Sequence, residues 1–105
     1  MSLYGEWLAA TIGNGDTSSD EVDLGRDYDF LEVIIPTITT GTLKCQTAEK
    51  TGGDYLDLGN TANTTASGTH NYHDVWELGG WQFIKIVASA AQGGERLIRV
   101  RGMRF

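Results

Sequence analysis

DEVDLGRDYDFLEVIIPTITTGTLKCQTAEKTGGDYLDLGN, residues 20–60, is the stretch that decides the fold of this 105-residue chain. Within it, apolar residues recur at every second position in several short runs, which is the period of a β-strand with one buried face. Glycine-rich and polar segments separate these runs, and no window keeps the 3.6-residue period of a helix. The stretch therefore predicts consecutive antiparallel strands joined by turns.

The strongest predicted strand of this stretch covers residues 28–35. Leu31, Val33 and Ile35 share one face, and apolar residues also occur on the other, so we expect a central strand. Pro36 ends this strand in the prediction, because proline has no backbone N–H to give to a sheet.

A hairpin is predicted after this strand. Residues 43–49 alternate between apolar and polar, and residues 51–54, Thr-Gly-Gly-Asp, have the composition of a tight turn. Residues 55–58 are expected to return antiparallel to the first arm. In this arrangement Leu56 and Leu58 face the core.

Glycines are expected to interrupt the chain at two further places. Residues 22–24 predict a short strand that ends at Gly25. Residues 74–78 predict another strand, which Gly79-Gly80 turns back into a dense apolar strand over residues 81–88. Three residues near this turn are expected to face the core: Val75, Trp76 and Leu78.

The two ends of the chain complete the predicted sheet. Residues 1–12 predict a first strand or an extended arm, and residues 96–105 a last strand. Residues 60–73 are polar and predict a long loop or a weak edge strand. About seven to eight short strands at this spacing are typical of an all-β antiparallel sandwich or jelly roll. We expect residues 1–105 to form one such domain.

Charge is unevenly distributed along the chain, which has a net charge of −6. Eleven of the fourteen acidic residues lie in residues 1–57, whereas the C-terminal strand carries Arg96, Arg99, Arg101 and Arg104. The arginines could pair with acids on neighbouring strands or form a contact with another protein. An acidic chain repels nucleic acid, so no nucleic-acid partner is expected.

The sequence also indicates where the protein is made. No apolar run approaches the roughly 20 residues that a membrane helix needs, so no membrane partner is expected. The start of the chain lacks the basic and long apolar segments of a signal peptide. We expect synthesis in a cytosol. The single cysteine, Cys45, cannot form an internal disulfide and is expected to be buried and unreactive.

Residues that could bind metal or perform catalysis do not form a recognisable set. His70, His73 and Asp74 are too few for a zinc site. Four polar residues alternate as calcium ligands do, but lack the glycine and glutamate of that loop: Asn14, Asp16, Ser18 and Asp20. A looser calcium site with Asp20 and Asp23 stays open. We expect no cofactor, no resident metal and no enzymatic activity.

Aromatic residues suggest an alternative role in sugar binding. Tyr72, Trp76 and Trp81 lie close in sequence around a predicted turn. If they are exposed, such rings can stack on sugars, and the chain would be a carbohydrate-binding module. The competing interpretation places them in the core or at an interface, which is the commonest use of large aromatic side chains.

Residues 20–101 resemble a family of small proteins of tailed bacteriophages. The segments that carry the resemblance are Glu21–Gly25, the strand that ends at Pro36, Tyr55–Asp57, Trp81–Val87, Ser89–Gln92 and Arg96–Val100. The resemblance implies a jelly-roll protein of the virion, similar to the decoration or cement proteins of phage heads. A component of the tail or baseplate is the other role that it leaves open.

The resemblance also implies a partner, a location and a contact surface. A decoration protein binds the major capsid protein on the outside of the head, as a homo-oligomer for which we expect a trimer, and strengthens the lattice. The residues expected to contact the capsid or a second subunit are Tyr4, Trp7, Leu8, Arg96, Arg99, Arg101 and Arg104. Burial of surface rather than chemistry would provide the affinity.

Overall fold

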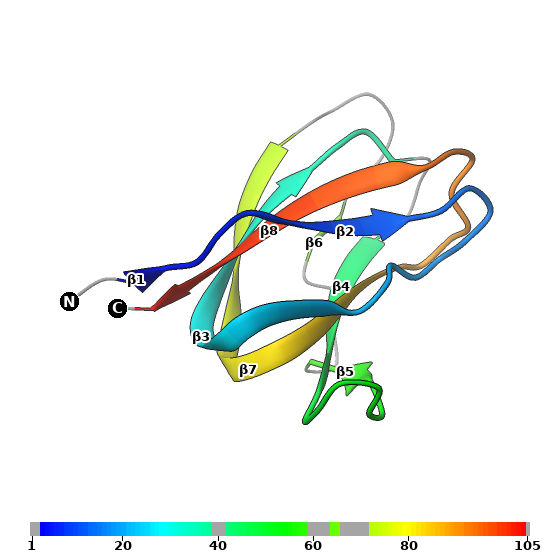
Figure 1. Ribbon diagram of the computed structural model, residues 1–105. Helices are drawn as coiled ribbons and strands as arrows, with labels where there is room; N and C mark the ends of the chain where they lie inside the picture. The colour runs from blue at the N-terminus through cyan, green and yellow to red at the C-terminus, as the bar shows by residue number, and fades with distance from the viewer. Residues whose placement is uncertain (1–2, 39–41, 59–63, 66–71, 105) are drawn as a thin grey trace.

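The computed structural model describes residues 3–38, 42–58, 64–65 and 72–104, and these residues contain strands but no helix (Figure 1). No helix long and apolar enough to cross a membrane therefore occurs among them. The strands are β1 (Leu3–Tyr4), β2 (Leu8–Ile12), β3 (Val22–Ile35), β4 (Thr42–Ala48), β5 (Leu56–Asp57), β6 (Thr64–Thr65), β7 (Tyr72–Ala88) and β8 (Arg96–Arg104). Every pairing between them is antiparallel. The predicted all-β antiparallel class is confirmed.

Two long strands, β3 and β7, form the centre of the sheet. The strand order is β1-β8-β3-β7-β4-β5, with β2 beside β8 and β6 beside β4. Over Phe30–Ile34, β3 is paired with β7 on one side and with β8 on the other. This confirms the predicted central strand, and β3 ends at Ile35, directly before Pro36.

The β3–β7 pair bends sharply, and this bend turns one continuous sheet into a small sandwich. The register shifts between Asp23 and Tyr28, where β3 has the extra residues, and again between Tyr28 and Phe30, where β7 has them. Gly25 has φ of 88°, and Gly79 and Gly80 have φ of 72° and 99°. L-residues with a side chain rarely adopt these positive values, so glycine permits the bulge in each strand.

Two predictions about these glycines are therefore wrong. Gly25 does not end a short strand, because β3 continues through it to Ile35. Gly79-Gly80 does not reverse the chain, because β7 runs without a break from Tyr72 to Ala88. A bulge and a turn both need glycine with positive φ, so the local sequence alone does not separate them.

Side chains from both layers meet in one core. Its fully buried members include Leu31, Val33, Leu43, Cys45, Ile84, Ile86, Ile98 and Val100. The predicted burial of Cys45 is confirmed, and burial raises the pKa of its thiol to about 12. Trp76, Leu78 and Leu58 also pack as predicted.

Two residues predicted to face the core are exposed instead. The side chain of Leu56 is 70% exposed and that of Val75 is 54% exposed. Leu56 lies on a two-residue edge strand with no further strand described beyond it, so nothing in the described chain covers it. Val75 pairs with Glu32 and shares its outward orientation.

The segment before β3 lies along the second half of β7, in the layer that also contains β4 and β5. β2 pairs along β8 from Leu8 to Ile12, so the N-terminal region is a strand. The chain then crosses to β7, where the N–H of Ser19 donates to the carbonyl of Ile86 and the N–H of Ile86 donates to the Ser19 hydroxyl oxygen, both at 2.9 Å. These bonds link the segment between β2 and β3 to the second half of β7.

Candidate functional site

The outer side of the layer formed by β2, β8, β3 and the first half of β7 is the first candidate site. We call it the arginine–aromatic face. Its residues alternate with the buried ones and pair across strands, as Glu32 with Arg101 and Ile34 with Arg99 do. The face comprises Tyr4, Trp7, Phe30, Glu32, Ile34, His73, Val75, Leu97, Arg99 and Arg101.

Arg101 is the residue that organises this face. Its guanidinium lies 4.7 Å from the centre of the Trp7 ring and 4.9 Å from that of Tyr4. It also donates two hydrogen bonds to one carboxylate oxygen of Glu32, the bond from Nε being 2.9 Å long. Arg99 lies over the same tryptophan at 5.8 Å. Cation–π contacts and a charge-assisted ion pair therefore fix the side chains of this face together.

The structure brings together four of the seven predicted contact residues and separates three. Tyr4, Trp7, Arg99 and Arg101 form the centre of the arginine–aromatic face. Leu8 is partly buried and packs against the core.

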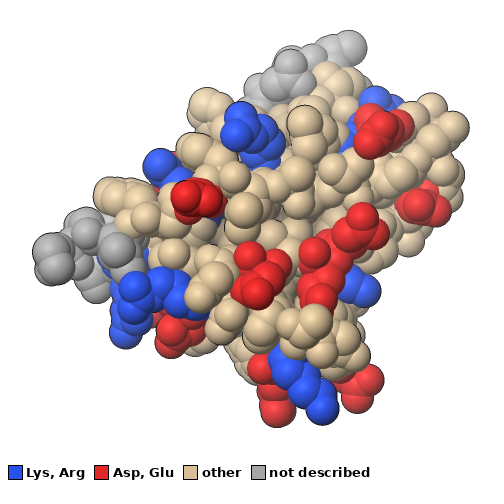
Figure 2. All heavy atoms as spheres, viewed as in Figure 1, with Lys and Arg blue, Asp and Glu red and all other residues tan. Residues whose placement is uncertain are grey.

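The other two arginines lie apart from this group. Arg96 is at the start of β8 and alternates with the outward residues, in step with buried Ile98. Arg104 is exposed and its nearest carboxylate, Asp27, is 3.9 Å away. The interpretation that outward arginines pair with acids of neighbouring strands is confirmed for Arg101, and Figure 2 shows the two signs of charge interspersed over the viewed surface.

A shallow hollow of about 450 Å³ lies on the arginine–aromatic face. Trp7, Glu32, Ile34, His73 and Val75 line it, together with parts of two neighbouring residues. The surface is therefore gently concave and carries both apolar and charged groups.

A second candidate site lies in the other layer, away from β1 and the chain ends in Figure 1. There a hollow of about 440 Å³ opens where the β4–β5 turn meets the second half of β7. We call it the β5 hollow. The residues that line it are Thr47, Ala48, Glu49, Lys50, Gly53, Asp54, Leu56, Asp57, Leu58 and Trp81.

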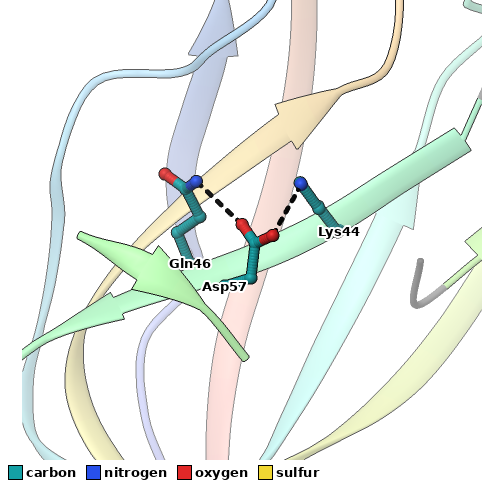
Figure 3. Close-up of polar contacts among 3 residues, drawn as sticks. All are labelled: Lys44, Gln46 and Asp57. Carbon is teal, nitrogen blue, oxygen red and sulfur yellow. Dashed lines mark hydrogen bonds and ion pairs between the residues drawn. The ribbon is translucent and has the colours of Figure 1, made fainter. Parts of the chain in front are cut away.

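Asp57 is held in place at this hollow by two neighbours on β4 (Figure 3). Lys44 Nζ donates to Asp57 Oδ2 and Gln46 Nε2 donates to Asp57 Oδ1, each at 2.9 Å. The bond from Lys44, followed by that from Gln46, lowers the pKa of the Asp57 carboxyl. This carboxylate is thus ionised and oriented at neutral pH.

A second network, of hydrogen bonds, holds the β4–β5 turn against the residue that precedes β3. Glu21, before β3, accepts a hydrogen bond from the hydroxyl of Tyr55 and another of 2.9 Å from the N–H of Gly52. These bonds lower the pKa of Glu21, the one from Tyr55 most. Burial first, and then the bond to Glu21, raises the pKa of Tyr55. Lys85 lies 4.6 Å from the centre of the Tyr55 ring, so the turn is tied to both β3 and β7.

The three aromatic residues proposed to face a sugar have different environments. Trp76 is buried, and its indole N–H donates to Asp74 at 3.1 Å, so it cannot stack on a sugar. Its assignment as a glycan-facing residue is wrong because its strand position points into the core. Trp81 packs partly on the core and lines the β5 hollow. The side chain of Tyr72 lies outside the described residues.

The possible metal ligands are dispersed. Within the described residues, no three His, Cys, Asp or Glu side chains come close enough to hold a metal ion. Asp23, the candidate for a looser calcium site, accepts hydrogen bonds from the N–H of Gly25 at 2.8 Å and from Gln82 at 2.9 Å. It stabilises the bulge of β3. His70 lies outside the described residues.

Sequence reasoning missed the β5 hollow. The pair Lys44 and Gln46, two residues apart on the outer face of β4, indicates only the contact with an acid on the next strand, because neither residue lines the hollow. The register that places Asp57 beside Gln46 depends on the turn between them, which a sequence pattern specifies only roughly.

Comparison with known proteins identifies similar folds but no matching sequence family. No protein-family model and no curated protein sequence matches the chain. A prophage-derived protein, YomS of SPBc2, has a similar structure with a TM-score of 0.65 and 12% identity, over 98% of this chain and 95% of that chain. CpGH89 from Clostridium perfringens, solved with its substrate GlcNAc-α-1,4-galactose, matches with a TM-score of 0.53 and 15% identity. This second match covers 92% of the present chain but 14% of CpGH89. At these identities the two matches show a shared all-β fold.

Proposed function

We propose that this chain is a non-enzymatic structural protein of a tailed-phage particle, and that it decorates the outer surface of the capsid. The observation that carries the proposal is the match to YomS, which spans nearly all of both chains. The match therefore relates this chain to a whole prophage-derived protein rather than to a fragment of one. The resemblance of residues 20–101 to phage virion proteins points to the same class.

The arginine–aromatic face is suited to bind the capsid. Protein interfaces are enriched in tyrosine, tryptophan, phenylalanine and arginine, and this face presents all four types. Its central residues, Arg101, Trp7 and Tyr4, already contact one another, so little side-chain entropy is lost when a partner binds. Under the proposal this face contacts the major capsid protein.

Decoration also implies an assembly state. We propose that three copies associate at local threefold positions of the capsid lattice, after synthesis in the host cytoplasm. Affinity would come from apolar surface buried across junctions between capsid subunits, with the fixed charge pairs setting orientation.

Co-assembly with the capsid protein of the same genome tests the proposal. The chain is expected to sediment with assembled heads, in a copy number that follows the capsid lattice. The variant Trp7→Ala/Arg99→Glu should lower this occupancy, whereas Asp57→Asn, on the other layer, should not. Full occupancy by the double variant would show that this face does not bind the capsid.

Copy number also separates decoration from a place in the tail or baseplate. A tail component should be present in numbers set by threefold or sixfold tail symmetry. Quantitative mass spectrometry of purified particles measures this directly. A copy number that matches tail symmetry would contradict capsid decoration and support a place in the tail or baseplate.

A further inference from the structure

We propose that copies of this chain associate head to tail, with Leu97 and Arg99 of one copy seated in the β5 hollow of the next copy. The contact rests on the association of copies proposed above, for which it names the two surfaces. It forms between copies alone and is therefore tested without the capsid. A negative result would leave the proposed capsid contact of Tyr4, Trp7 and Arg101 standing.

The β5 hollow opens on the core side of the second layer, at its edge. Leu56 pairs with Thr47, and the N–H of Leu58 donates to the carbonyl of Cys45 at 2.9 Å. Thr47 and Cys45 are buried, so Leu56 and Leu58 point to the core side of the strand pair, where Trp81 also lines the hollow. Leu56 is nevertheless 70% exposed. An apolar side chain from another molecule can therefore complete the core at this edge.

Two carboxylates lie on the same side of the strand pair as Leu56. Glu49 follows Thr47 by two residues, Asp54 precedes Leu56 by two residues, and both acids line the hollow. Neither side chain has an ion-pair or hydrogen-bond partner among the described residues. Lys50 is the one cation among the residues that line the hollow. The hollow therefore combines apolar surface with net negative charge, which favours an apolar side chain next to a cation.

The chain presents that combination on β8. Leu97 is 53% exposed, Arg99 is also exposed, and the two residues point outward from the same face. Arg99 lies over Trp7 at 5.8 Å and pairs with no carboxylate among the described residues. Leu97 and Arg99 are two residues apart, as are Leu56 and Asp54, and this spacing is about 6.6 Å along an extended chain. Leu97 can therefore lie against Leu56 while Arg99 pairs with Asp54.

These two surfaces do not meet within one chain. Leu97 pairs with Thr11 of β2 in the first layer, whereas β5 is at the edge of the second layer. Figure 1 shows the start of β8 at the upper right and β5 at the bottom of the view. A contact between two different surfaces of identical copies is heterologous, and it closes into a ring when the rotation between neighbours permits. A ring of three copies would match the trimer proposed above.

Sedimentation equilibrium of the full chain, at concentrations up to about 1 mM, tests the proposal. The unchanged chain is expected to form oligomers. Leu97→Asp removes the inserted apolar side chain, and Leu56→Asp adds a further carboxylate to the hollow. Each variant should lower the association constant at least about tenfold. Both side chains are well exposed in the monomer, so circular dichroism should show that the variants keep the folded sheet.

Val75→Asp is the matched control. It makes the same substitution at a residue that is 54% exposed, close to the 53% of Leu97, but lies on β7 outside the proposed contact. This variant should associate as the unchanged chain does. An equal loss in Val75→Asp would overturn the assignment of the contact to Leu97.

Mixing the two contact variants distinguishes a head-to-tail contact from a symmetric one. The Leu56→Asp copy keeps Leu97, and the Leu97→Asp copy keeps the hollow. The mixture should form one-to-one pairs and nothing larger, because one intact surface of each kind remains. The proposal is overturned if the unchanged chain is monomeric throughout, if either variant alone associates as strongly as the unchanged chain, or if the mixture stays monomeric.

Charge reversal tests the pair of Arg99 with Asp54. Arg99→Glu and Asp54→Arg should each weaken association roughly tenfold, because each places like charges in contact. A chain with both changes should recover most of the loss, since the pair is then restored with its signs exchanged. Absence of this recovery would overturn the pairing of these two residues.

Discussion

One ion pair lies at the centre of the arginine–aromatic face and another lies beside the β5 hollow, and the two pairs differ in burial. In the face, Arg101 and Glu32 are each 26% exposed, and two aromatic rings cover the guanidinium. Beside the hollow, on the outer face of β4 and β5, Lys44 and Asp57 are 35% and 46% exposed. Water screens the second pair more strongly, so it orients a carboxylate without adding much stability.

This difference separates two uses of charge on one small protein. In the face, the charged groups hold one another and the aromatic rings in place, which leaves a rigid surface for a large partner. The pair beside the β5 hollow leaves the Asp57 carboxylate ionised and open to solvent on the outer face of β4 and β5. Each prediction below tests one side of this contrast.

The largest effect is expected beneath the face, at Gly102. A Cβ built on this residue would lie 2.1 Å from Cδ2 of the Tyr28 ring, which is buried against it. Gly102→Ala should therefore reduce the free energy of unfolding by about 3 kcal/mol, through overpacking. Urea denaturation followed by tryptophan fluorescence measures this value. Gly94→Ala is the control, since its nearest neighbour would be 3.9 Å away, and it should change little.

A smaller effect should distinguish the two ion pairs directly. Arg101→Met removes the pair with Glu32 and both ring contacts, and should cost about 1–2 kcal/mol. Lys44→Met removes the exposed pair with Asp57 and should cost less than about 0.5 kcal/mol. Both changes replace a long cation by the same apolar side chain. Equal losses in denaturation experiments would contradict the contrast between face and hollow.

Acid should reduce stability through the hydrogen-bonded carboxylates, and two of these, Glu21 and Asp57, lie around the β4–β5 turn. Glu21 and Asp57 have pKa values lowered from 4.5 and 3.8 by their hydrogen bonds. A lowered pKa in the folded state contributes stability that is present above the unfolded value and is lost as the pH falls through the folded value. We expect stability to decline below about pH 4.5, and Glu21→Gln to make the decline shallower. An unchanged acid profile in that variant would show that the Glu21 network adds no stability.

The smallest effect is expected at Arg104. Its ion pair with Asp27 is 3.9 Å long, and both side chains are well exposed. Arg104→Gln should change the free energy of unfolding by less than about 0.3 kcal/mol. A larger loss in the denaturation midpoint would mean that the end of β8 takes part in the support of the face.

Much of the strand pattern was predictable because side-chain alternation is a local property. Leu31, Val33 and Cys45 follow the two-residue period and are buried, and Pro36 follows the end of β3. Burial at sheet edges was not predictable in the same way. Leu56 follows the two-residue period but lies on an edge strand, where its side chain is exposed to solvent.

The candidate sites were predictable only in part. Tyr4, Trp7 and Arg101 were each selected from the sequence as contact residues, but their contact with one another arises from the pairing of β1 and β2 with β8. The β5 hollow was not predicted, since its lining comes from the β4–β5 hairpin and from Trp81, more than twenty residues further on. Such long-range proximity has no local pattern.

The amino-acid sequence by itself determined the all-β class, the central strand and the buried cysteine, because these depend on the alternation and turn chemistry of neighbouring residues. Only the tertiary structure decided which charged side chains pair. Acids concentrated in residues 1–57 and arginines concentrated after residue 95 are segregated in the chain, yet antiparallel pairing sets Glu32 beside Arg101. The same pairing decided that Gly25 and Gly79-Gly80 bend two strands together, because a glycine with positive φ becomes a turn or a bulge according to the strand that lies opposite.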